Sequence, residues 1–258
     1  MHGGRFCYMM RNANVKKGEK IMRMRTKKWA RPELAACDFF IKEPAKQIGH
    51  WRELFANPEN PMQLELGCGK GVFLSKLACD HPEINYIGID LSSDVLGVAR
   101  RLIVQEYERV KRTVDNVKLL SFDIELILRM LNGQDEIDRI YINFCNPWPK
   151  AGNHKKRLTH TRQLLKYRTF LKENGEIWFK TDDDDLFLAS QGYFQESGYT
   201  IEYLTKDLHG SGFAPNYLTE HEERFTAEGI PTKFLIARKG RLDKLPIEEK
   251  YLVLKEPE

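Results

Sequence analysis

A glycine-rich segment with a carboxylate just before it is the first feature of this sequence whose residue types and spacing could do chemistry. Residues 64–71 are Leu-Glu-Leu-Gly-Cys-Gly-Lys-Gly, so the glycines are Gly67, Gly69 and Gly71. Glycine lets a backbone turn sharply and approach a ligand closely, because no Cβ intervenes. Glu65 precedes the glycines, and Asp90 ends the next predicted strand, where a carboxylate can accept hydrogen bonds from both hydroxyls of a ribose. The segment therefore predicts a nucleotide-type ligand.

Three ligand classes compete for such a loop. Dinucleotide sites prefer G-x-G-x-x-G, whereas here the third glycine comes one residue early, and a Walker-type loop has a different spacing. The charge of Glu65 would repel a pyrophosphate but would attract the sulfonium and ammonium groups of S-adenosylmethionine. These residues favour S-adenosylmethionine over NAD. Asp123, at the end of the third predicted strand, either accepts the adenine amino hydrogens or caps the following helix, and both roles are compatible.

The fourth predicted strand runs into Asn-Phe-Cys-Asn-Pro-Trp-Pro-Lys, residues 143–150. In an open α/β sheet, the carboxyl end of such a strand faces the reacting group. Asn146-Pro147 before an aromatic residue is similar to the site of amino-methyltransferases, although Trp148 here separates two prolines. Cys145 could be a nucleophile, but its neighbours favour inert packing.

Positive charge is concentrated in two segments. Residues 1–31 hold ten Lys and Arg against one acid, and residues 143–172 hold eight against none, while the whole chain has a formal net charge of only +4. The rest of the chain is therefore strongly acidic. Two basic segments on an acidic body indicate a docking surface for a polyanion, and two solvated charge runs are the alternative.

The elements that must position these residues alternate between strand and helix. Seven short apolar runs rich in β-formers are predicted strands: Met62–Leu66, Ile84–Asp90, Val117–Phe122, Ile137–Asn143, Glu176–Thr181, Thr200–Leu204 and Lys233–Arg238. Predicted helices are Gly71–Cys79, a helix capped by Ser92 or Ser93, Ile124–Leu131, Leu158–Lys172 and Asp183–Glu196. This alternation predicts an α/β fold with a seven-stranded, mostly parallel sheet and an antiparallel edge. Such a sheet resembles the Rossmann-like fold of class I S-adenosylmethionine-dependent methyltransferases, which is the expected fold class.

Outside this domain, expected at residues 22–239, residues 1–21 resemble a polar leader and residues 240–258 a charged tail. Five scattered cysteines without metal-like spacing favour reduced thiols in a cytoplasm, and no apolar run is long enough for a membrane span. Asp182–Asp185 could suggest a metal cluster, but they precede an apolar helix and more simply favour its N-terminus. Thr219-Glu220-His221-Glu222 fits a capping box at a helix start. No metal site is expected.

The sequence resembles the bacterial tRNA (guanine-N7-)-methyltransferase family over residues 22–238. The resemblance rests on Met-Arg-Met-Arg at 22–25, the glycine loop, Tyr-Ile-Gly-Ile-Asp at 86–90, the segment 143–150, Phe-Lys-Thr-Asp at 179–182 and Thr-Glu-His-Glu at 219–222. It implies methyl transfer from S-adenosylmethionine to N7 of the guanine at position 46 in the variable loop of tRNA. It also implies a cofactor site at Glu65, Asp90, Asp123 and Asn146, and guanosine contacts from Lys150, Asp182 and Thr219, Glu220, His221 and Glu222. The implied RNA contacts are Gly152, Asn153, His154, Lys155, Lys156 and Arg157.

The chain departs from the family pattern at two places. Asn146 stands where the family commonly has Asp, and His154 is displaced by one residue. N7 of guanine has a lone pair and no proton, so Asn146 is expected to position the reactants without a general base. The protein is expected to be a cytoplasmic monomer or homodimer. The alternatives are a methyltransferase for another RNA or a small molecule, and a non-catalytic RNA-binding module that retains the fold.

Overall fold

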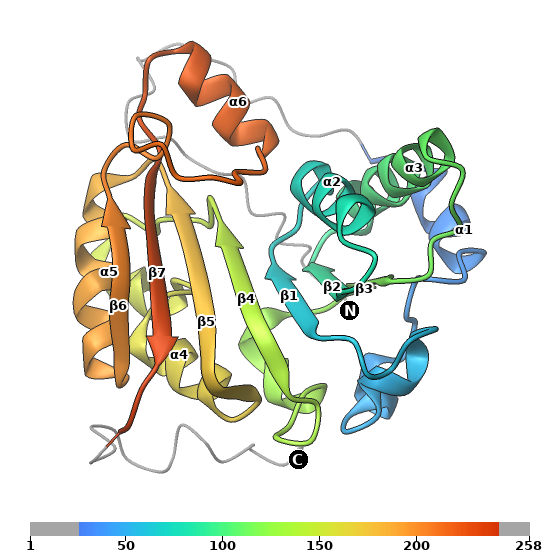
Figure 1. Ribbon diagram of the computed structural model, residues 1–258, viewed down its shortest axis with the longest axis horizontal. Coiled ribbons are helices and arrows are strands. Elements are labelled where there is room, and N and C mark those ends of the chain that lie inside the picture. Colours follow the sequence, from blue (N-terminus) through green and yellow to red (C-terminus); the bar gives the residue numbers. More distant parts are fainter. Residues whose placement is uncertain (1–25, 243–258) are drawn as a thin grey trace, which may run out of the picture.

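A seven-stranded sheet in the order β3-β2-β1-β4-β5-β7-β6 organises the protein, whose computed structural model describes residues 26–242 (Figure 1). The strands are β1 Met62–Leu66, β2 Asn85–Asp90, β3 Val117–Ser121, β4 Ile137–Asn143, β5 Leu171–Thr181, β6 Tyr199–Thr205 and β7 Lys233–Lys239. β1 to β5 pair in parallel, and β7 lies antiparallel between β5 and the edge strand β6. The predicted fold class is confirmed. The predicted leader and all but residues 240–242 of the predicted tail lie outside the described residues.

Helices cover both faces of the sheet and enclose two separate apolar cores. The α-helices are α1 Ala30–Ala35, α2 Val72–Asp80, α3 Ser93–Arg109, α4 Thr161–Arg168, α5 Asp184–Glu196 and α6 Glu220–Ala227. One core joins α4 and α5 to the leucines and isoleucines that β1, β2 and β4 turn toward them. The other core joins α1, α2 and α3 to the opposite face of β1 to β4. Over residues 26–242, none of the helices combines the length and apolarity needed to cross a membrane.

The predicted helix Leu158–Lys172 differs most from the structure. α4 occupies only Thr161–Arg168, and β5 already begins at Leu171, where Leu171 pairs with Ile137 of β4. The apolar residues at 164, 165, 167, 170 and 171 recur at spacings that suit a helix, so periodicity does not separate the two elements. The predicted helix Ile124–Leu131 is a 3₁₀ segment, η3 Ile124–Arg129, because the backbone at Leu126 leaves helical geometry.

A row of alternating charges crosses one face of β4, β5, β7 and β6. Arg139 pairs with Glu176 (2.9 Å), Glu176 with Arg238 (2.7 Å), and Arg238 with Glu202 (2.6 Å). The Arg139 guanidinium also stacks 4.2 Å from the ring centroid of Trp178. In the described part of the chain no helix covers β5, β7 and β6 on this side, as Figure 1 shows. The charge row lets this face of the sheet meet water.

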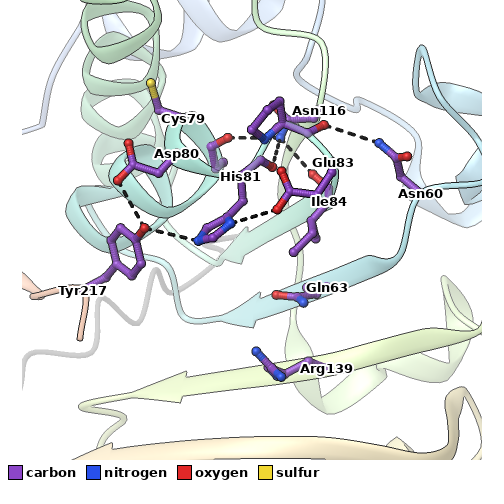
Figure 2. Close-up of polar contacts among 12 residues, drawn as sticks. Asn60, Gln63, Cys79, Asp80, His81, Glu83, Ile84, Asn116, Arg139 and Tyr217 are labelled. Carbon is purple, nitrogen blue, oxygen red and sulfur yellow. Dashed lines mark hydrogen bonds and ion pairs between the residues drawn. The ribbon is translucent and has the colours of Figure 1, made fainter. Parts of the chain in front are cut away.

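Hydrogen bonds hold the long loop 206–219 against the C-terminal end of α2 (Figure 2). The Tyr217 hydroxyl donates to Oδ2 of Asp80 (3.1 Å) and lies 3.2 Å from Nε2 of His81. Beneath this contact, the buried amide of Asn116 donates to the carbonyl oxygens of Ala78, His81 and Ile84. These carbonyls at and after the end of α2 therefore have a fixed donor, which gives the loop a rigid support.

Candidate functional site

The loop between β1 and α2 leaves open space beside two of its glycines. Gly67, Gly69 and Gly71 all have positive φ, at 78°, 54° and 74°, and the Gly67 N–H donates to the carbonyl oxygen of Ile89 (2.8 Å). Among residues 26–242, a Cβ at Gly67 or Gly69 would meet nothing within 4 Å, whereas one at Gly71 would lie 2.8 Å from the Cβ of Ala99 on α3. Gly67 and Gly69 therefore border a space for a ligand, and Gly71 is needed for close packing of α3.

Asp90 ends β2 next to that space and holds the loop in place. Its Oδ2 accepts from the Gly69 N–H (3.0 Å), and its Oδ1 accepts from the Ser92 N–H (2.9 Å). Burial raises the pKa of this carboxyl group above its usual value. The next side chain, Leu91, is 63% exposed, which is unusual for a leucine beside a strand end and offers an apolar surface to a ligand ring.

Asp123 lies at the end of β3, exposed, one strand away from Asp90. Its Oδ1 accepts from the Glu125 N–H (2.9 Å), so the predicted capping role is present at the start of η3. The Phe122 N–H donates to the carbonyl oxygen of Asp90, which brings the two strand ends together. The other carboxylate oxygen of Asp123 can still accept from a ligand, because the cap uses only one.

Glu65 is a buried carboxylate with only one oxygen paired. Oε1 accepts from Nδ2 of Asn143 (3.0 Å), while Oε2 has no hydrogen-bond partner among the described residues. Burial raises the pKa of Glu65 to about 7, against the opposing effects of the Asn143 hydrogen bond and the charge of Lys180. An unpaired buried carboxylate oxygen is costly, and a cationic ligand would satisfy it. The residues present thus fit a ligand that carries an ammonium or sulfonium group.

The turn after β4 is held in an unusual backbone conformation. Phe144 and Trp148 have positive φ, 50° and 45°, which is rare for aromatic residues and is typical of functional sites. Oδ1 of the half-buried Asn146 accepts from the Trp148 N–H (3.0 Å), so its amide nitrogen remains available to donate to a ligand. Burial raises the pKa of Cys145 to about 12, so its thiol stays protonated, in accord with the predicted inert role.

The predicted RNA-contact residues divide into exposed and buried members. Gly152 and Lys155 are exposed, while Asn153, His154 and Lys156 are half-buried in the short 3₁₀ segment η4, Ala151–Lys156. Lys150, which was predicted to contact the guanosine, is also exposed. The Lys156 ammonium lies 4.9 Å from the ring centroid of Trp148. Arg157 is only 2% exposed, and its Nε donates to the carbonyl oxygen of Pro147 (2.7 Å). Arg157 therefore supports the turn from inside, and the predicted phosphate contact does not fit its burial.

The segment Thr219–Glu222 forms the predicted capping box at the start of α6. The Thr219 hydroxyl accepts from the Glu222 N–H (3.0 Å), and the Glu222 carboxylate returns to the Thr219 N–H. Glu222 is fully buried and forms an ion pair with Lys180 (2.9 Å). Thr219 and Glu222 thus have structural partners, and Glu220 and His221 are the members of this segment that solvent reaches.

His221 faces the strained turn. Its ring stacks on Phe144, with centroids 6.0 Å apart and planes 17° from parallel. Burial lowers the pKa of His221, so the ring is neutral at neutral pH. Burial also raises the pKa of the half-buried Asp182, and the electrostatic interaction between Asp182 and His221 shows that the two side chains are near each other. Asp182, His221 and the turn at residues 144–148 therefore lie together at the carboxyl ends of β4 and β5.

Two buried polar residues that interact with Glu65 were not singled out as site residues in the sequence analysis, namely Asn143 and Lys180. They are register neighbours on β4 and β5, and they also line an aromatic-walled cavity of about 200 Å³ beside α2 that the predicted cofactor residues do not line. A lysine inside the apolar strand Ile-Trp-Phe-Lys-Thr is a signal that could have identified Lys180, because an unpaired lysine is almost never buried. In residues 26–242 no group of three or more His, Cys, Asp or Glu side chains could hold a metal ion.

The sheet order, the open glycine loop and the half-paired carboxylate define a class I S-adenosylmethionine-dependent methyltransferase. Residues 59–235 match a family model described as a putative methyltransferase. A solved structure described as an antibiotic-related methyltransferase aligns with a TM-score of 0.52 at 18% identity, covering 77% of this chain and 92% of that one. A 16S rRNA methyltransferase, KamB, aligns with a TM-score of 0.51 at 11% identity, covering 70% and 89%. Both likenesses concern the fold.

Comparison with proteins of similar sequence identifies the family more narrowly than the fold does. The tRNA (guanine-N(7)-)-methyltransferase of Clostridium botulinum strain Eklund 17B is 58% identical over 218 residues, which are 84% of this chain and 99% of that protein. The enzyme of the same name from Ruminiclostridium cellulolyticum is 58% identical over 217 residues, covering 84% and 92%. The chain belongs to the bacterial tRNA (guanine-N7-)-methyltransferase family.

Binding of S-adenosylhomocysteine, which retains the ammonium group, is expected to release a proton from Glu65. Without ligand this carboxyl group is about half protonated at pH 7, and a cation favours the ionised form. Affinity should therefore rise with pH and level off above about pH 8, falling up to about tenfold per unit below pH 7. Calorimetric titration in buffers of different ionisation enthalpy measures the released proton.

The matched variant is Glu65→Gln, which keeps the shape but cannot titrate. Its affinity should be lower and nearly independent of pH between 6 and 8. A wild-type affinity that does not change over this range would contradict the assignment of the cation to Glu65.

Proposed function

We propose that the protein transfers the methyl group of S-adenosylmethionine to N7 of guanine in tRNA, at position 46 of the variable loop. The observation that carries this proposal is the buried, half-paired Glu65 beside the open glycine loop, at the same sheet edge as Asn146 and Asp182. The names of the relatives support the choice of tRNA and of N7. Such a substrate suits a cytoplasmic protein.

The cofactor residues bind and orient the methyl donor. Glu65 takes the cationic end, Gly67 and Gly69 let the backbone approach, and Asp90 receives the ribose, with Asp123 and Leu91 toward the adenine. When bound, S-adenosylmethionine supplies a methyl carbon on a positively charged sulfur. The N7 lone pair forms the new bond to that carbon, while the electrons of the broken bond return to sulfur.

The substrate residues place the guanine. A carboxylate at Asp182 can accept from N1–H and from the amino group, which lie on the opposite side of the ring from N7. This contact turns N7 toward the cofactor, and the Asn146 amide can donate to the neighbouring O6. No proton leaves N7, so the site has to supply placement and exclusion of water, and a general base is not needed.

The exposed cations after the turn are the proposed contact with tRNA phosphates. Lys150 and Lys155 are exposed, and η4 carries His154 and Lys156 beside them. This segment continues directly from the turn that holds Asn146, so phosphate contacts here would bring the variable loop to the transferring methyl group.

Nucleoside analysis of tRNA tests the proposal directly. Unmodified tRNA incubated with the protein and labelled S-adenosylmethionine should yield 7-methylguanosine at one variable-loop position. A transcript with adenosine at position 46 is the control and should stay unlabelled. Label in another nucleoside, or in the control transcript, would refute the assigned substrate.

Asn146→Ala should lower the methylation rate about 10- to 100-fold without abolishing it, because one positioning hydrogen bond is lost and no proton transfer depends on it. The rate with saturating tRNA and cofactor measures this effect, and the affinity for S-adenosylhomocysteine should change little. Asn146→Asp restores the side chain common in the family and should retain activity. Complete inactivity of Asn146→Ala with intact cofactor binding would contradict a placement mechanism.

Lys155→Ala should weaken tRNA binding and reduce the salt dependence of log Kd by about one, as loss of one phosphate contact requires. Lys42→Ala removes an exposed lysine outside the basic segment and is the control. An unchanged salt dependence for Lys155→Ala would contradict a phosphate contact at this residue.

Arg157→Ala should destabilise the fold by about 1–3 kcal/mol, because the buried hydrogen bond from Arg157 to the Pro147 carbonyl oxygen is lost. Urea unfolding measures this change in the free energy of unfolding.

A further inference from the structure

A row of buried polar side chains crosses the sheet from the cofactor site to α6. Glu65 on β1 accepts from Asn143 on β4 (3.0 Å), and Asn143 is the register neighbour of Lys180 on β5. Lys180 then pairs with Glu222 of α6 (2.9 Å). The side chains of Lys180 and Glu222 are 5% and 0% exposed, so their charges are hardly screened by water. The row therefore joins two sites that are far apart in sequence.

Lys180 donates its hydrogen bonds to the loop 206–219 and to α6, and none of them to Glu65 or Asn143. Its ammonium donates to Oδ1 of Asn216, to the carbonyl oxygen of Tyr217 (2.9 Å) and to Oε2 of Glu222, all in the loop 206–219 or α6. Glu65 attracts the same ammonium through space. One buried cation thus lies between two buried carboxylates and holds the loop and the first turn of α6 on the sheet.

A cationic ligand at Glu65 changes the electrostatic attraction between Glu65 and Lys180. The ligand pairs with the free Oε2 of Glu65 and neutralises that carboxylate, so the attraction of Lys180 toward Glu65 falls. Lys180 is then left with Glu222 as its buried anionic partner, so the charge state at Glu65 and the position of α6 depend on the same ammonium. Glu220 and His221 stand in the first turn of α6, and His221 stacks on Phe144 beside the methyl-transfer site.

We infer that Lys180 is a positioning residue that couples two events. These are the binding of the cofactor at Glu65 and the placement of α6 against the guanosine of the bound tRNA. The inference rests on the proposed function, because the second ligand of the coupled pair is tRNA. Coupling between two binding sites is reciprocal, so a cationic cofactor should raise the affinity for tRNA by the same factor by which tRNA raises the affinity for the cofactor. The size of this change in affinity should depend more on the charge of the cofactor than on its shape.

Binding of tRNA in the absence of turnover tests the coupling. Sinefungin carries a cationic amine where S-adenosylmethionine has its sulfonium, whereas S-adenosylhomocysteine has a neutral sulfur there. With the wild-type protein, sinefungin should raise tRNA affinity about fivefold or more, and S-adenosylhomocysteine should raise it less. Filter binding or fluorescence anisotropy at fixed salt measures the ratio.

The decisive variant is Lys180→Met with Glu222→Gln. Removing both charges avoids a lone buried carboxylate, and glutamine at this position still completes the capping box. If Lys180 only holds α6 in place, the double variant should keep the wild-type ratio. If it couples the sites, the ratio should fall to about one. Lys239→Met is the matched control and should keep the ratio. It removes a lysine on β7 that is 10% exposed and pairs with Glu173 of β5.

A wild-type protein whose tRNA affinity does not respond to sinefungin would overturn the inference, as would a double variant that keeps the wild-type ratio. These outcomes leave the proposed function standing, because 7-methylguanosine formation is measured separately. Absence of tRNA binding altogether would remove the proposed function, and this inference with it.

Discussion

The buried carboxylate of Glu65 is the constraint on which the rest of the site depends. A carboxylate in an apolar sheet is costly unless it is neutralised, and Asn143 pairs only one of its oxygens. The protein can meet this cost by holding a proton at neutral pH or by binding a cation. The open backbone at Gly67 and Gly69 lies beside this group, so ligand space and unsatisfied charge occur together. Under the proposed function, specificity for a cationic methyl donor follows from electrostatics as well as from shape.

The parallel sheet explains why residues distant in sequence meet at one edge. β1, β2, β3, β4 and β5 run in the same direction, so the segments that follow each strand gather at their common carboxyl end. Asp90, Asn146 and Asp182 come from three such segments. α6 reaches the same edge by another route, because Lys180 holds the loop before it and the capping box fixes its first turn. Covalent order matters less here than strand direction.

Much of the fold and part of the site could be predicted from the sequence. The glycine loop, Asp90 and the strand runs have local signals, since positive φ and apolar alternation constrain residue type directly. The start of β5 at Leu171 has no such signal, because leucine and phenylalanine suit a helix and a buried strand equally. Arg157 and Glu222 look like surface charges in the sequence. Their burial depends on partners, Pro147 and Lys180, that only the tertiary structure brings within hydrogen-bonding distance.

The alternating row formed by Arg139, Glu176, Arg238 and Glu202 has a consequence for how a polyanion meets the protein. The four charges sum to zero and each neighbours its opposite, so their long-range fields largely cancel. An approaching nucleic acid feels almost no pull toward it. The exposed lysines beyond the end of β4 have no such compensation in their own segment. A tRNA that diffuses toward the protein is therefore attracted more strongly to the lysines than to the face with the balanced charges. Encounters are biased toward the productive orientation before any specific contact forms.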